Sequence, residues 1–383
     1  MIYMDNSVTS FPKPCEVVKE TKKAISRYFA NPGRSTFKGA VKVSEAIYEA
    51  RENLALLVGT LPENIIFTYN ATYALNMVLQ GIIKEKMTVM TDRFAHNSVL
   101  RPLYALQKKK VNVKFLDTHP LYDSVMISSF EKAVEKGKVD VLVLTHTSNV
   151  TGKHTPIKRL SAICKKHGVL LVVDASQGLG SCDIDMRKLG IDILISSGHK
   201  GLYGIMGTGF IAVGEGRKIE IEPLITGGSG IFSHLKTMPD ALPERLEAGT
   251  LGVPGIISMK AGAEFLMRVG VEDIGHKERL LRTRLIDGLS GISGVSVYNA
   301  DVNTNSIVLF NFDRLSSAIG AERMEKEGIA LRAGFHCAPL IHSVIGKGKR
   351  DYDGALRLSV GFFNTGRECE RVIRAVSRIA KEV

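Results

Sequence analysis

The stretch IDILISSGHKG, residues 191–201, combines a buried strand with a lysine that follows it directly. Ile191–Ile195 is apolar apart from one acid, which is typical of a parallel strand covered on both faces. Small residues, a histidine and a glycine-rich segment up to Gly209 surround Lys200. A lysine becomes a covalent nucleophile when burial or nearby positive charge lowers its pKa. The alternative is a loop lysine whose amine reaches solvent, and this stretch alone favours neither.

A second apolar run, VLLVVDASQG at residues 169–178, ends in the carboxylate of Asp174. Pyridoxal phosphate requires an acid beside its pyridine nitrogen, which stays protonated and lets the ring accept electrons, and its aldehyde binds a lysine. Asp174 is alternatively a cap of the following helix. Together with Lys200, this acid favours a pyridoxal phosphate site.

Strand and helix patterns alternate through the first two thirds of the chain. This alternation predicts a mostly parallel α/β sheet whose ligands bind at the carboxyl ends of the strands. The strand patterns cover residues 65–68, 86–90, 111–115, 139–144, 169–173 and 191–195. The polar candidates that directly follow strands are Thr72, His96, Asn149, Asp174, Gln177, His199 and Lys200.

The rest of the chain predicts a smaller α+β domain. Helical patterns cover residues 255–289 and 367–381, and strand patterns lie near 295–297, 306–310 and 355–359. We therefore expect an N-terminal segment 1–15 that packs with the small domain, a large cofactor-binding domain 16–255, and a small domain 256–383.

Composition is that of an ordinary globular protein. The chain has 383 residues, of which 44% are hydrophobic and 23% charged, and its net charge is +12. Because the basic residues are scattered and Lys108–Lys110 has no aromatic neighbours, a solvated basic surface is favoured over nucleic-acid binding. No apolar stretch spans a bilayer and no signal peptide pattern begins the sequence, so we expect a cytoplasmic protein without a membrane partner.

The five cysteines include no CxxC pair. Neither a disulfide framework nor a zinc site is therefore predicted. Cys164 and Cys182 lie in apolar surroundings and are interpreted as packing residues, and no metal ligands are assigned.

Several side chains suit an anionic cofactor and its substrate. Asn70–Thr72 opens a helix, so its free N–H groups and a hydroxyl favour a phosphate, although Thr72 is alternatively an ordinary cap. His199 and the hydroxyl of Ser196 or Ser197 are candidates to complete this phosphate site. His96 suits stacking on the ring and proton transfer, with a capping histidine as the alternative.

Two further segments indicate amino-acid chemistry. Arg357 lies in the apolar run ALRLSV, residues 355–360, and its guanidinium matches a carboxylate; a structural salt bridge is the alternative. LRAGFHCAP, residues 331–339, is interpreted as a mobile loop in which an arginine and a histidine favour the thiolate of Cys337. A buried, inert cysteine is the alternative.

Eight motifs together resemble the class V aminotransferase family of pyridoxal-phosphate enzymes, and within it the cysteine desulfurase and selenocysteine lyase group. The resemblance covers nearly the whole chain. The motifs are MDN at 4–6 with Thr9, NPGR at 31–34, HNS at 96–98, SNVTG at 148–152, VDASQ at 173–177, SGHK at 197–200, EAGT at 247–250 and RAGFHCA at 332–338.

The resemblance implies a fold-type I transferase with a seven-stranded sheet and assigns a role to each candidate. Lys200 binds the cofactor aldehyde and then acts as base at the substrate α-carbon. The cofactor contacts are Asp174 at the pyridinium, His96 on the ring, Asn149 and Gln177 at the ring oxygen and neighbouring atoms, Ala71, Thr72, Ser197 and His199 at the phosphate, and Thr250 at the phosphate of the neighbouring subunit. Asn149, Arg332 and Arg357 bind the substrate.

By the same resemblance, Cys337 attacks the sulfur of substrate cysteine, becomes a persulfide and releases alanine. The role of Thr250 implies a homodimer, and the persulfide implies a possible sulfur- or selenium-acceptor protein. Selenocysteine cleavage, transamination and β-elimination are the alternative reactions. A basic scaffold that binds a protein or RNA is the non-enzymatic alternative.

Overall fold

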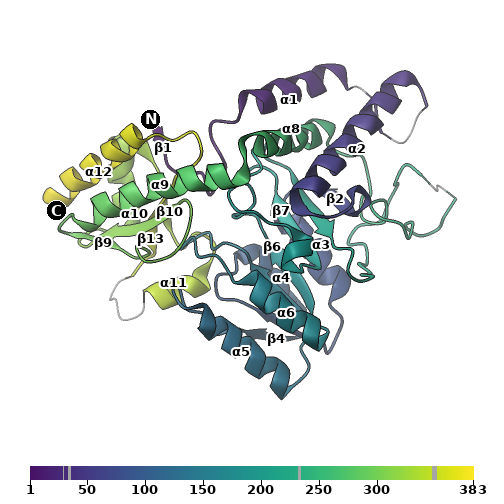
Figure 1. Cartoon of the computed structure of the whole chain (residues 1–383), viewed down its shortest axis with the longest axis horizontal. Coiled ribbons are helices and arrows are strands. Elements are labelled where there is room, and N and C mark those ends of the chain that lie inside the picture. Colours follow the sequence, from purple (N-terminus) through teal and green to yellow (C-terminus); the bar gives the residue numbers. More distant parts are fainter. Residues whose placement is uncertain (29, 33–35, 232–233, 347–351) are drawn as a thin grey trace.

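A computed structural model of the chain describes residues 1–28, 30–32, 36–231, 234–346 and 352–383 (Figure 1). Gly33 and Arg34 of the NPGR motif lie outside the described residues.

A seven-stranded sheet forms the centre of the larger part of the molecule. Its strands are β2 (Ile65–Thr68), β3 (Thr88–Thr91), β4 (Asn112–Phe115), β5 (Val141–Thr145), β6 (Leu170–Asp174), β7 (Ile193–Ser197) and β8 (Gly209–Val213). They are ordered β2-β8-β7-β6-β5-β3-β4, and β8 runs antiparallel to both of its neighbours while the other pairs are parallel. The predicted mostly parallel sheet is confirmed.

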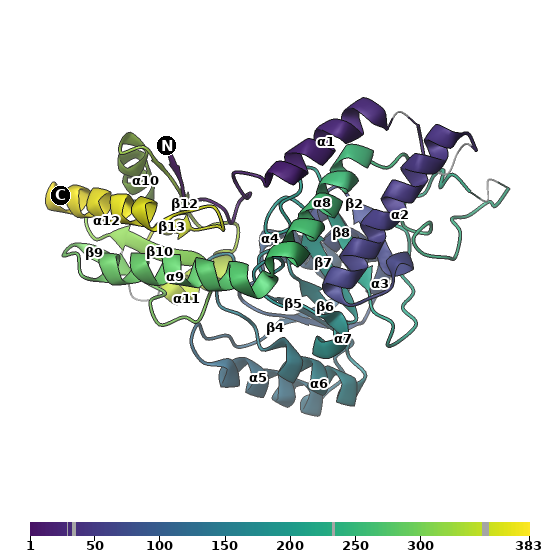
Figure 2. The ribbon, with the colours of Figure 1, turned by 45° about the horizontal axis from the view of Figure 1, so that its top comes forward.

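Helices cover both faces of this sheet (Figures 1 and 2). They are α1 (Cys15–Arg27), α2 (Lys38–Val58), α3 (Ala71–Ile82), α4 (Asn97–Gln107), α5 (Asp123–Lys136), α6 (Ile157–His167), α7 (Met186–Leu189) and α8 (Val253–Val269). Strand side chains alternate between the faces: Leu142 and Leu144 belong to a core that also contains residues of α2, α5, α6 and α8, whereas Val141 and Val143 belong to a core that contains residues of α3 and α4. An apolar core therefore lies on each face of the sheet.

The smaller part of the molecule has its own core. Its elements are β1 (Ile2–Tyr3), α9 (Val271–Ser290), β9 (Val295–Val297), β10 (Ile307–Phe312), α10 (Ser317–Lys326), β11 (Ile329–Ala330), β12 (Arg332–Gly334), α11 (Pro339–Ile345), β13 (Ala355–Ser359) and α12 (Gly366–Lys381). An antiparallel sheet, β12-β13-β10-β9, packs beneath α9 and α12, and β1 pairs in parallel with β11. This is the α+β arrangement expected.

The predicted domain limits stay proposals, and packing favours one change to them. The N-terminal segment joins the small part, because Asp5 forms a bridge with Ser359. However, buried residues of α8 belong to the core of the large sheet, and α8 packs on α1 and α2. We therefore propose the second division at Gly270, between α8 and α9, rather than after residue 255.

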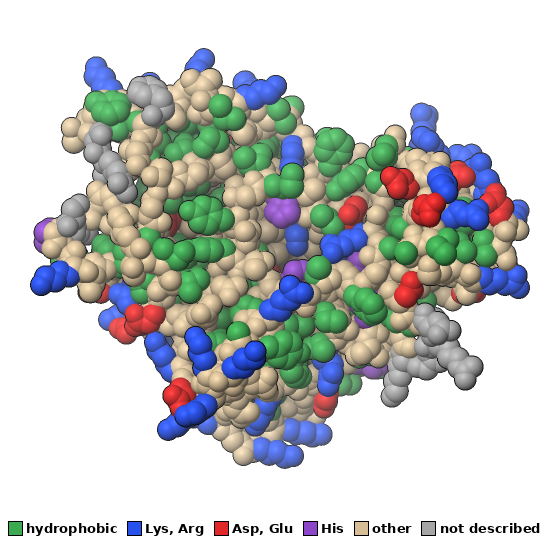
Figure 3. Space-filling view, turned by 180° about the vertical axis from the view of Figure 1, so that it is seen from behind, with side chains coloured by type: hydrophobic (Ala, Val, Ile, Leu, Met, Phe, Trp, Pro, Cys, Tyr) green, Lys and Arg blue, Asp and Glu red, His purple; other side chains and the backbone are tan. Residues whose placement is uncertain are grey.

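Figure 3 shows Lys and Arg side chains distributed over the visible face, with acidic side chains among them. This distribution agrees with the interpretation of the charge as a solvated surface. None of the described helices is long and apolar enough to cross a membrane.

Candidate active site

A cavity of about 220 Å³ lies at the carboxyl ends of β5, β6 and β7. It gathers most of the predicted site residues, namely Ala71, Thr72, His96, Asn149, Asp174, Gln177, Ser197, His199, Lys200, Arg332 and Arg357. Of the described residues that were predicted, only Cys337 and Thr250 are not part of the lining. The strand-end candidates therefore meet in one place, although their individual roles stay predictions.

Lys200 lies in the connection between β7 and β8, which close contacts fix. The Gly198 N–H donates to the Thr208 carbonyl over 2.9 Å, so the two strands hold both ends of the connection. A Cβ at Gly201 would lie 1.9 Å from the Leu179 carbonyl oxygen, so only glycine allows this close approach to the turn after β6. That turn follows Asp174, and the approach brings Lys200 to the same cavity.

The surroundings of Lys200 favour a neutral amine. Burial lowers its pKa to about 8, with Asp174 acting in the opposite direction and Arg357 and Arg332 adding to the lowering. A lysine with such a pKa supplies unprotonated nitrogen near neutral pH, which reaction with an aldehyde requires.

His96 is the helix cap that the sequence offered as an alternative, and it also lines the cavity, while its predicted role at the cofactor ring stays a prediction. Its Nδ1 accepts the Ser98 backbone N–H over 3.1 Å, which caps α4, and its ring also lines the cavity. Burial, followed by the charge of Lys200, lowers its pKa to about 4. The neutral ring thus carries its proton on Nε2, because Nδ1 acts as an acceptor.

One end of the cavity is suited to an anion. Asn70 caps α3 by accepting the Tyr73 N–H over 2.8 Å, and Ala71 and Thr72 form the first turn beside the cavity. The N–H groups of a first helical turn lack intrahelical partners and attract negative charge. Ser197 and His199 line the same cavity, as the predicted phosphate site requires.

Arg357 is a buried cation held by two partners. It donates to Asp5 Oδ1 over 2.8 Å and to the Asn149 carbonyl over 2.7 Å. Asn149 in turn donates from Nδ2 to the His336 carbonyl over 2.6 Å. The structural salt bridge considered for Arg357 is therefore present, while its guanidinium still lines the cavity.

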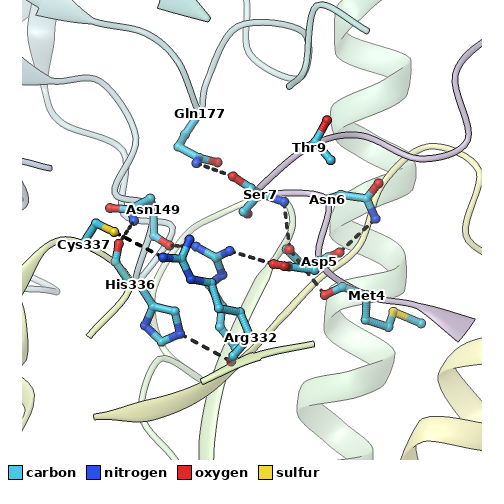
Figure 4. A network of polar contacts seen from close by, with 12 residues as sticks. Met4, Asp5, Asn6, Ser7, Thr9, Asn149, Gln177, Arg332, His336 and Cys337 are labelled. Atoms are coloured by element: carbon cyan, nitrogen blue, oxygen red, sulfur yellow. Dashed lines mark hydrogen bonds and ion pairs between the residues drawn. The ribbon is translucent and has the colours of Figure 1, made fainter. Parts of the chain in front are cut away.

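The segment that carries Cys337 is anchored to the cavity wall, which contradicts its interpretation as a mobile loop. Arg332–Gly334 forms β12 and pairs with β13, and the Asn97 N–H donates to the Cys337 carbonyl over 2.7 Å. His336 and Cys337 adopt left-handed φ values of 50° and 59°, a conformation that costs non-glycine residues roughly 1–3 kcal/mol. Arg332 Nη2 lies 3.2 Å from Cys337 Sγ and is placed to donate to a thiolate (Figure 4).

Two predicted residues have partners that the sequence did not indicate. Gln177 Nε2 donates to the Ser7 carbonyl over 2.8 Å, which fixes the amide against the N-terminal segment. Thr250 is exposed and accepts from Asn31 over 3.3 Å, away from the cavity of its own chain. The predicted contact of Thr250 with a neighbouring subunit stays a prediction.

Sequence reasoning assigned no role of their own to several polar side chains in the lining. They are Ser7, Asn70, Ser98, Thr145, Thr147 and Ser176. Asn70, Ser98 and Ser176 lie inside stretches quoted above, and Thr147 lies one position before the SNVTG motif. Ser7 comes from the N-terminal segment, and its only signal was the adjacent MDN motif.

Comparison with known proteins identifies the family. The aminotransferase class-V profile matches residues 2–372. The chain belongs to the class-V aminotransferase family. This family is pyridoxal-phosphate dependent.

Relatives within the family carry a more specific name. A probable cysteine desulfurase of Methanothermobacter thermautotrophicus is 29% identical and covers 99% of this chain and 94% of its own. The apo cysteine desulfurase structure of Thermococcus onnurineus has a TM-score of 0.91 at 28% identity, covering 100% of this chain and 95% of its own. An S-sulfonic acid form of an Escherichia coli cysteine desulfurase has a TM-score of 0.85 at 26% identity, covering 99% and 94%.

The cavity fits the cofactor of the family. Five buried polar atoms of its lining have no hydrogen-bond partner within the described ranges: Thr145 Oγ1, Asn149 Oδ1, Ser197 Oγ, His199 Nδ1 and Arg357 Nε. Buried polar atoms of this kind are costly unless a ligand satisfies them. They lie with a lysine, a carboxylate and a helix N-terminus, which are the groups that an aldehyde, a pyridinium and a phosphate require.

Proposed function

We infer that this chain is a pyridoxal-phosphate-dependent cysteine desulfurase. It takes the sulfur of L-cysteine onto Cys337 as a persulfide and leaves L-alanine. In this reaction the substrate Cβ–Sγ bond breaks, a bond forms between that sulfur and Cys337 Sγ, and a proton replaces sulfur at Cβ.

The anchored position of Cys337 supports this proposal most strongly. A thiol with only a packing role needs no left-handed backbone and no arginine beside its sulfur. Here Asn97 and Asn149 tie the segment to the cavity wall, and Arg332 joins the cavity lining to Cys337 Sγ. The sulfur therefore lies next to the residues that would bind an amino acid.

Each of the other site residues would have a role that suits its chemistry. Asp174 would pair with the pyridinium and Lys200 with the aldehyde, while Ala71, Thr72, Ser197 and His199 would hold the phosphate. When bound, pyridoxal phosphate supplies an electron sink for negative charge at the substrate α-carbon. Lys200, with its lowered pKa, accepts the α-proton, and the neutral His96, which lines the cavity, holds a proton on Nε2.

Substrate selection rests on the two arginines. Arg332 and Arg357 line the cavity, and Arg357 keeps Nε unpartnered among the described residues, so a substrate carboxylate has a cationic site. Asn149 Oδ1 is a free acceptor for the substrate or the ring. This arrangement accepts a small amino acid and does not distinguish cysteine from selenocysteine.

Alanine production and persulfide formation test the proposal together. Purified protein loaded with cofactor should convert L-cysteine to L-alanine and carry a persulfide on the Cys337 peptide by mass spectrometry. Cys337→Ala should retain cofactor absorbance but lose at least about 100-fold in alanine formation. Lys200→Ala should lose activity as well as the absorbance of the lysine-bound cofactor.

Other outcomes would contradict the assignment. Turnover unaffected by Cys337→Ala would indicate transamination or β-elimination, in which this thiol has no role. Release of selenide from selenocysteine at a far higher kcat/KM than release of sulfur from cysteine would indicate a selenocysteine lyase. A protein that binds RNA and takes up no cofactor would be the basic scaffold instead.

We further propose that the enzyme works as a homodimer and passes sulfur to an acceptor protein. Thr250 supports the dimer, because it is exposed and does not line the cavity of its own chain. A persulfide formed on Cys337 requires a thiol acceptor for the next turnover.

A further inference from the structure

Three side chains of the types that commonly bind metals lie close together, outside the lining of the cavity. His146 follows β5, His154 precedes α6, and Cys182 belongs to the turn after β6. Their ligand atoms all lie within 4.8 Å of one another. His146 is buried, and the other two are half-buried. No step of the proposed desulfurase reaction uses any of them.

The distances between the ligand atoms of these three residues are close to those in a tetrahedral metal site. A zinc ion with Zn–S near 2.3 Å and Zn–N near 2.0–2.1 Å places sulfur and nitrogen ligands about 3.6 Å apart. Cys182 Sγ lies 3.9 Å from His154 Nδ1. Thr147 Oγ1 contacts His146 Nδ1 at 2.8 Å and His154 Nδ1 at 3.0 Å, so a hydroxyl already lies between the two imidazoles. That hydroxyl or a water would occupy the fourth position.

A supporting shell surrounds this cluster. Asn305 Nδ2 lies 3.4 Å from Cys182 Sγ as a donor, and Arg279 Nη1 donates to Asn305 Oδ1 over 2.8 Å. Donors of this kind stabilise a metal-bound thiolate and orient it. A Cβ at Gly178 would lie 2.3 Å from His146 Nδ1, so glycine leaves room on the other side of the cluster.

We propose that His146, His154 and Cys182 bind a single divalent metal ion of the thiolate-preferring class, with Zn²⁺ as the representative. A set of two imidazoles and one thiolate matches that class and not Mg²⁺ or Ca²⁺, which take oxygen ligands. The alternative is a metal-free cluster in which the Thr147 hydroxyl satisfies both imidazoles.

The site would fasten two segments that line the cavity. One is the 146–154 segment, which carries Asn149, and the other is the turn that carries Gln177 and ends at Cys182. Sequence spacing did not reveal this group, because His154 and Cys182 are 28 residues apart and meet only when β5 and β6 are adjacent. The metal would position these two segments and stabilise the fold, and its site is separate from that of the cofactor.

Zinc binding by the full-length holoenzyme tests the proposal. All proteins carry Cys337→Ala, which removes the competing thiol of the cavity, and are dialysed against a chelator before titration with ZnCl₂. We expect about one zinc per chain, determined by elemental analysis, and a raised melting temperature. Cys182→Ser and His154→Gln should each weaken zinc binding at least tenfold, and Asn305→Ala should weaken it about 10- to 100-fold.

The control is Cys369→Ser, which removes a buried thiol from the core of the small part. It should bind zinc as well as its parent. X-ray absorption of the zinc-loaded parent should show one sulfur at about 2.3 Å and nitrogen ligands at about 2.0–2.1 Å, a result that does not depend on the folding of any variant. Zinc content unchanged by Cys182→Ser, no zinc in the parent, or a spectrum without sulfur would overturn the proposal.

Discussion

Lys200 illustrates how the environment of one residue defines its chemistry. Its side chain is half-buried and lines the cavity, and burial of its amine lowers its pKa from 10.5 to about 8. Asp174 opposes this change and Arg357 reinforces it. Because the effect of burial dominates, half of the amine is neutral at a pH within the range in which enzymes usually work.

A pH profile should reveal this shift. In cofactor-free protein, reaction of Lys200 with a small aldehyde, trapped by cyanoborohydride and followed on its peptide by mass spectrometry, should have a midpoint near pH 8. The neutral form reacts, so the rate rises with pH through the folded-state pKa. Asp174→Asn should move the midpoint to lower pH, because it removes the interaction that raises the pKa. A midpoint near 10.5, or an upward move in Asp174→Asn, would contradict this account.

The Arg357–Asp5 ion pair should be important for stability. The Arg357 side chain is 1% exposed and that of Asp5 is 18% exposed. Breaking a buried pair leaves an uncompensated charge and costs about 3–5 kcal/mol, so Asp5→Asn should lower the free energy of unfolding by about 3 kcal/mol. Urea denaturation measures the change.

The matched control for this prediction is Asp240→Asn, which breaks the ion pair of Arg245 with a fully exposed carboxylate. Exposed pairs are worth about 0–1 kcal/mol, so this variant should unfold almost like the parent. Equal effects of the two substitutions would show that burial does not govern the Asp5 pair.

The sequence predicted which residues the cavity gathers where one motif holds the whole signal. Asp174 ends β6, His96 and Lys200 lie a few residues beyond β3 and β7, and strand ends converge in a parallel sheet. Asp5 was not foreseen as a partner of Arg357, because 352 residues separate them. A local pattern cannot show which distant charge a buried arginine meets.

At the scale of elements, helix α8 determines how firmly the Lys200 connection is held. A Cβ at Gly262 would lie 1.9 Å from the Leu202 carbonyl oxygen. The helix therefore packs directly on the backbone two residues beyond Lys200. Glycine in a helix interior normally lowers stability by about 1 kcal/mol relative to alanine, so its presence here reflects this contact.

Gly262→Ala should consequently destabilise the protein despite the better helix propensity of alanine. Overpacking costs roughly 1–3 kcal/mol, and we expect a loss in this range together with weaker cofactor binding. Gly291→Ala at the end of α9, where a Cβ meets nothing within 4 Å, is the control and should be neutral or slightly stabilising. Thermal unfolding and cofactor titration test both variants. A stabilised Gly262→Ala protein would be evidence against the close contact.

Strands β8 and β12 are among those that escaped the sequence patterns, each for a physical reason. GFIAV of β8 follows a glycine-rich segment, so its apolar run lacked the helix-strand alternation that marked the others. Arg332–Gly334 of β12 has three half-buried residues and no periodic signal, and only pairing with β13 makes it a strand. Tertiary pairing decides short edge strands, whereas long apolar runs are evident in sequence.

At the scale of the whole molecule, the N-terminal segment connects the two parts. Asp5 and Ser7 hydrogen-bond to residues of β13, while Thr9 and Ser10 donate to the His199 carbonyl. The cavity is therefore bounded by the large sheet, the small sheet and a segment that contacts both.

Mixed dimers should show whether Thr250 serves a neighbouring subunit. If it does, a mixed dimer of Lys200→Ala and Thr250→Ala chains has one site with both changes and one intact site. Refolding the two inactive proteins together should then restore activity to about a quarter of wild type, since half of the dimers are mixed. Mixing Lys200→Ala with Asp174→Ala is the control and should restore nothing, because both residues belong to the same chain's cavity. No recovery in the first mixture would mean that Thr250 acts within its own chain or not at all.

The reversed direction of β8 has a consequence for engineering this scaffold. If β8 ran parallel to β7, the chain leaving β7 would have to return along the length of the sheet before entering β8. The first residues of such a connection would not be held by a backbone hydrogen bond between its two ends. Here residues 198–208 form a closed arc whose two ends share a backbone hydrogen bond between Gly198 and Thr208. Insertion or deletion of a single amino acid in this arc would rotate the Lys200 side chain out of the cavity or break the β7–β8 register, so length variation in this arc should be far less tolerated than substitution.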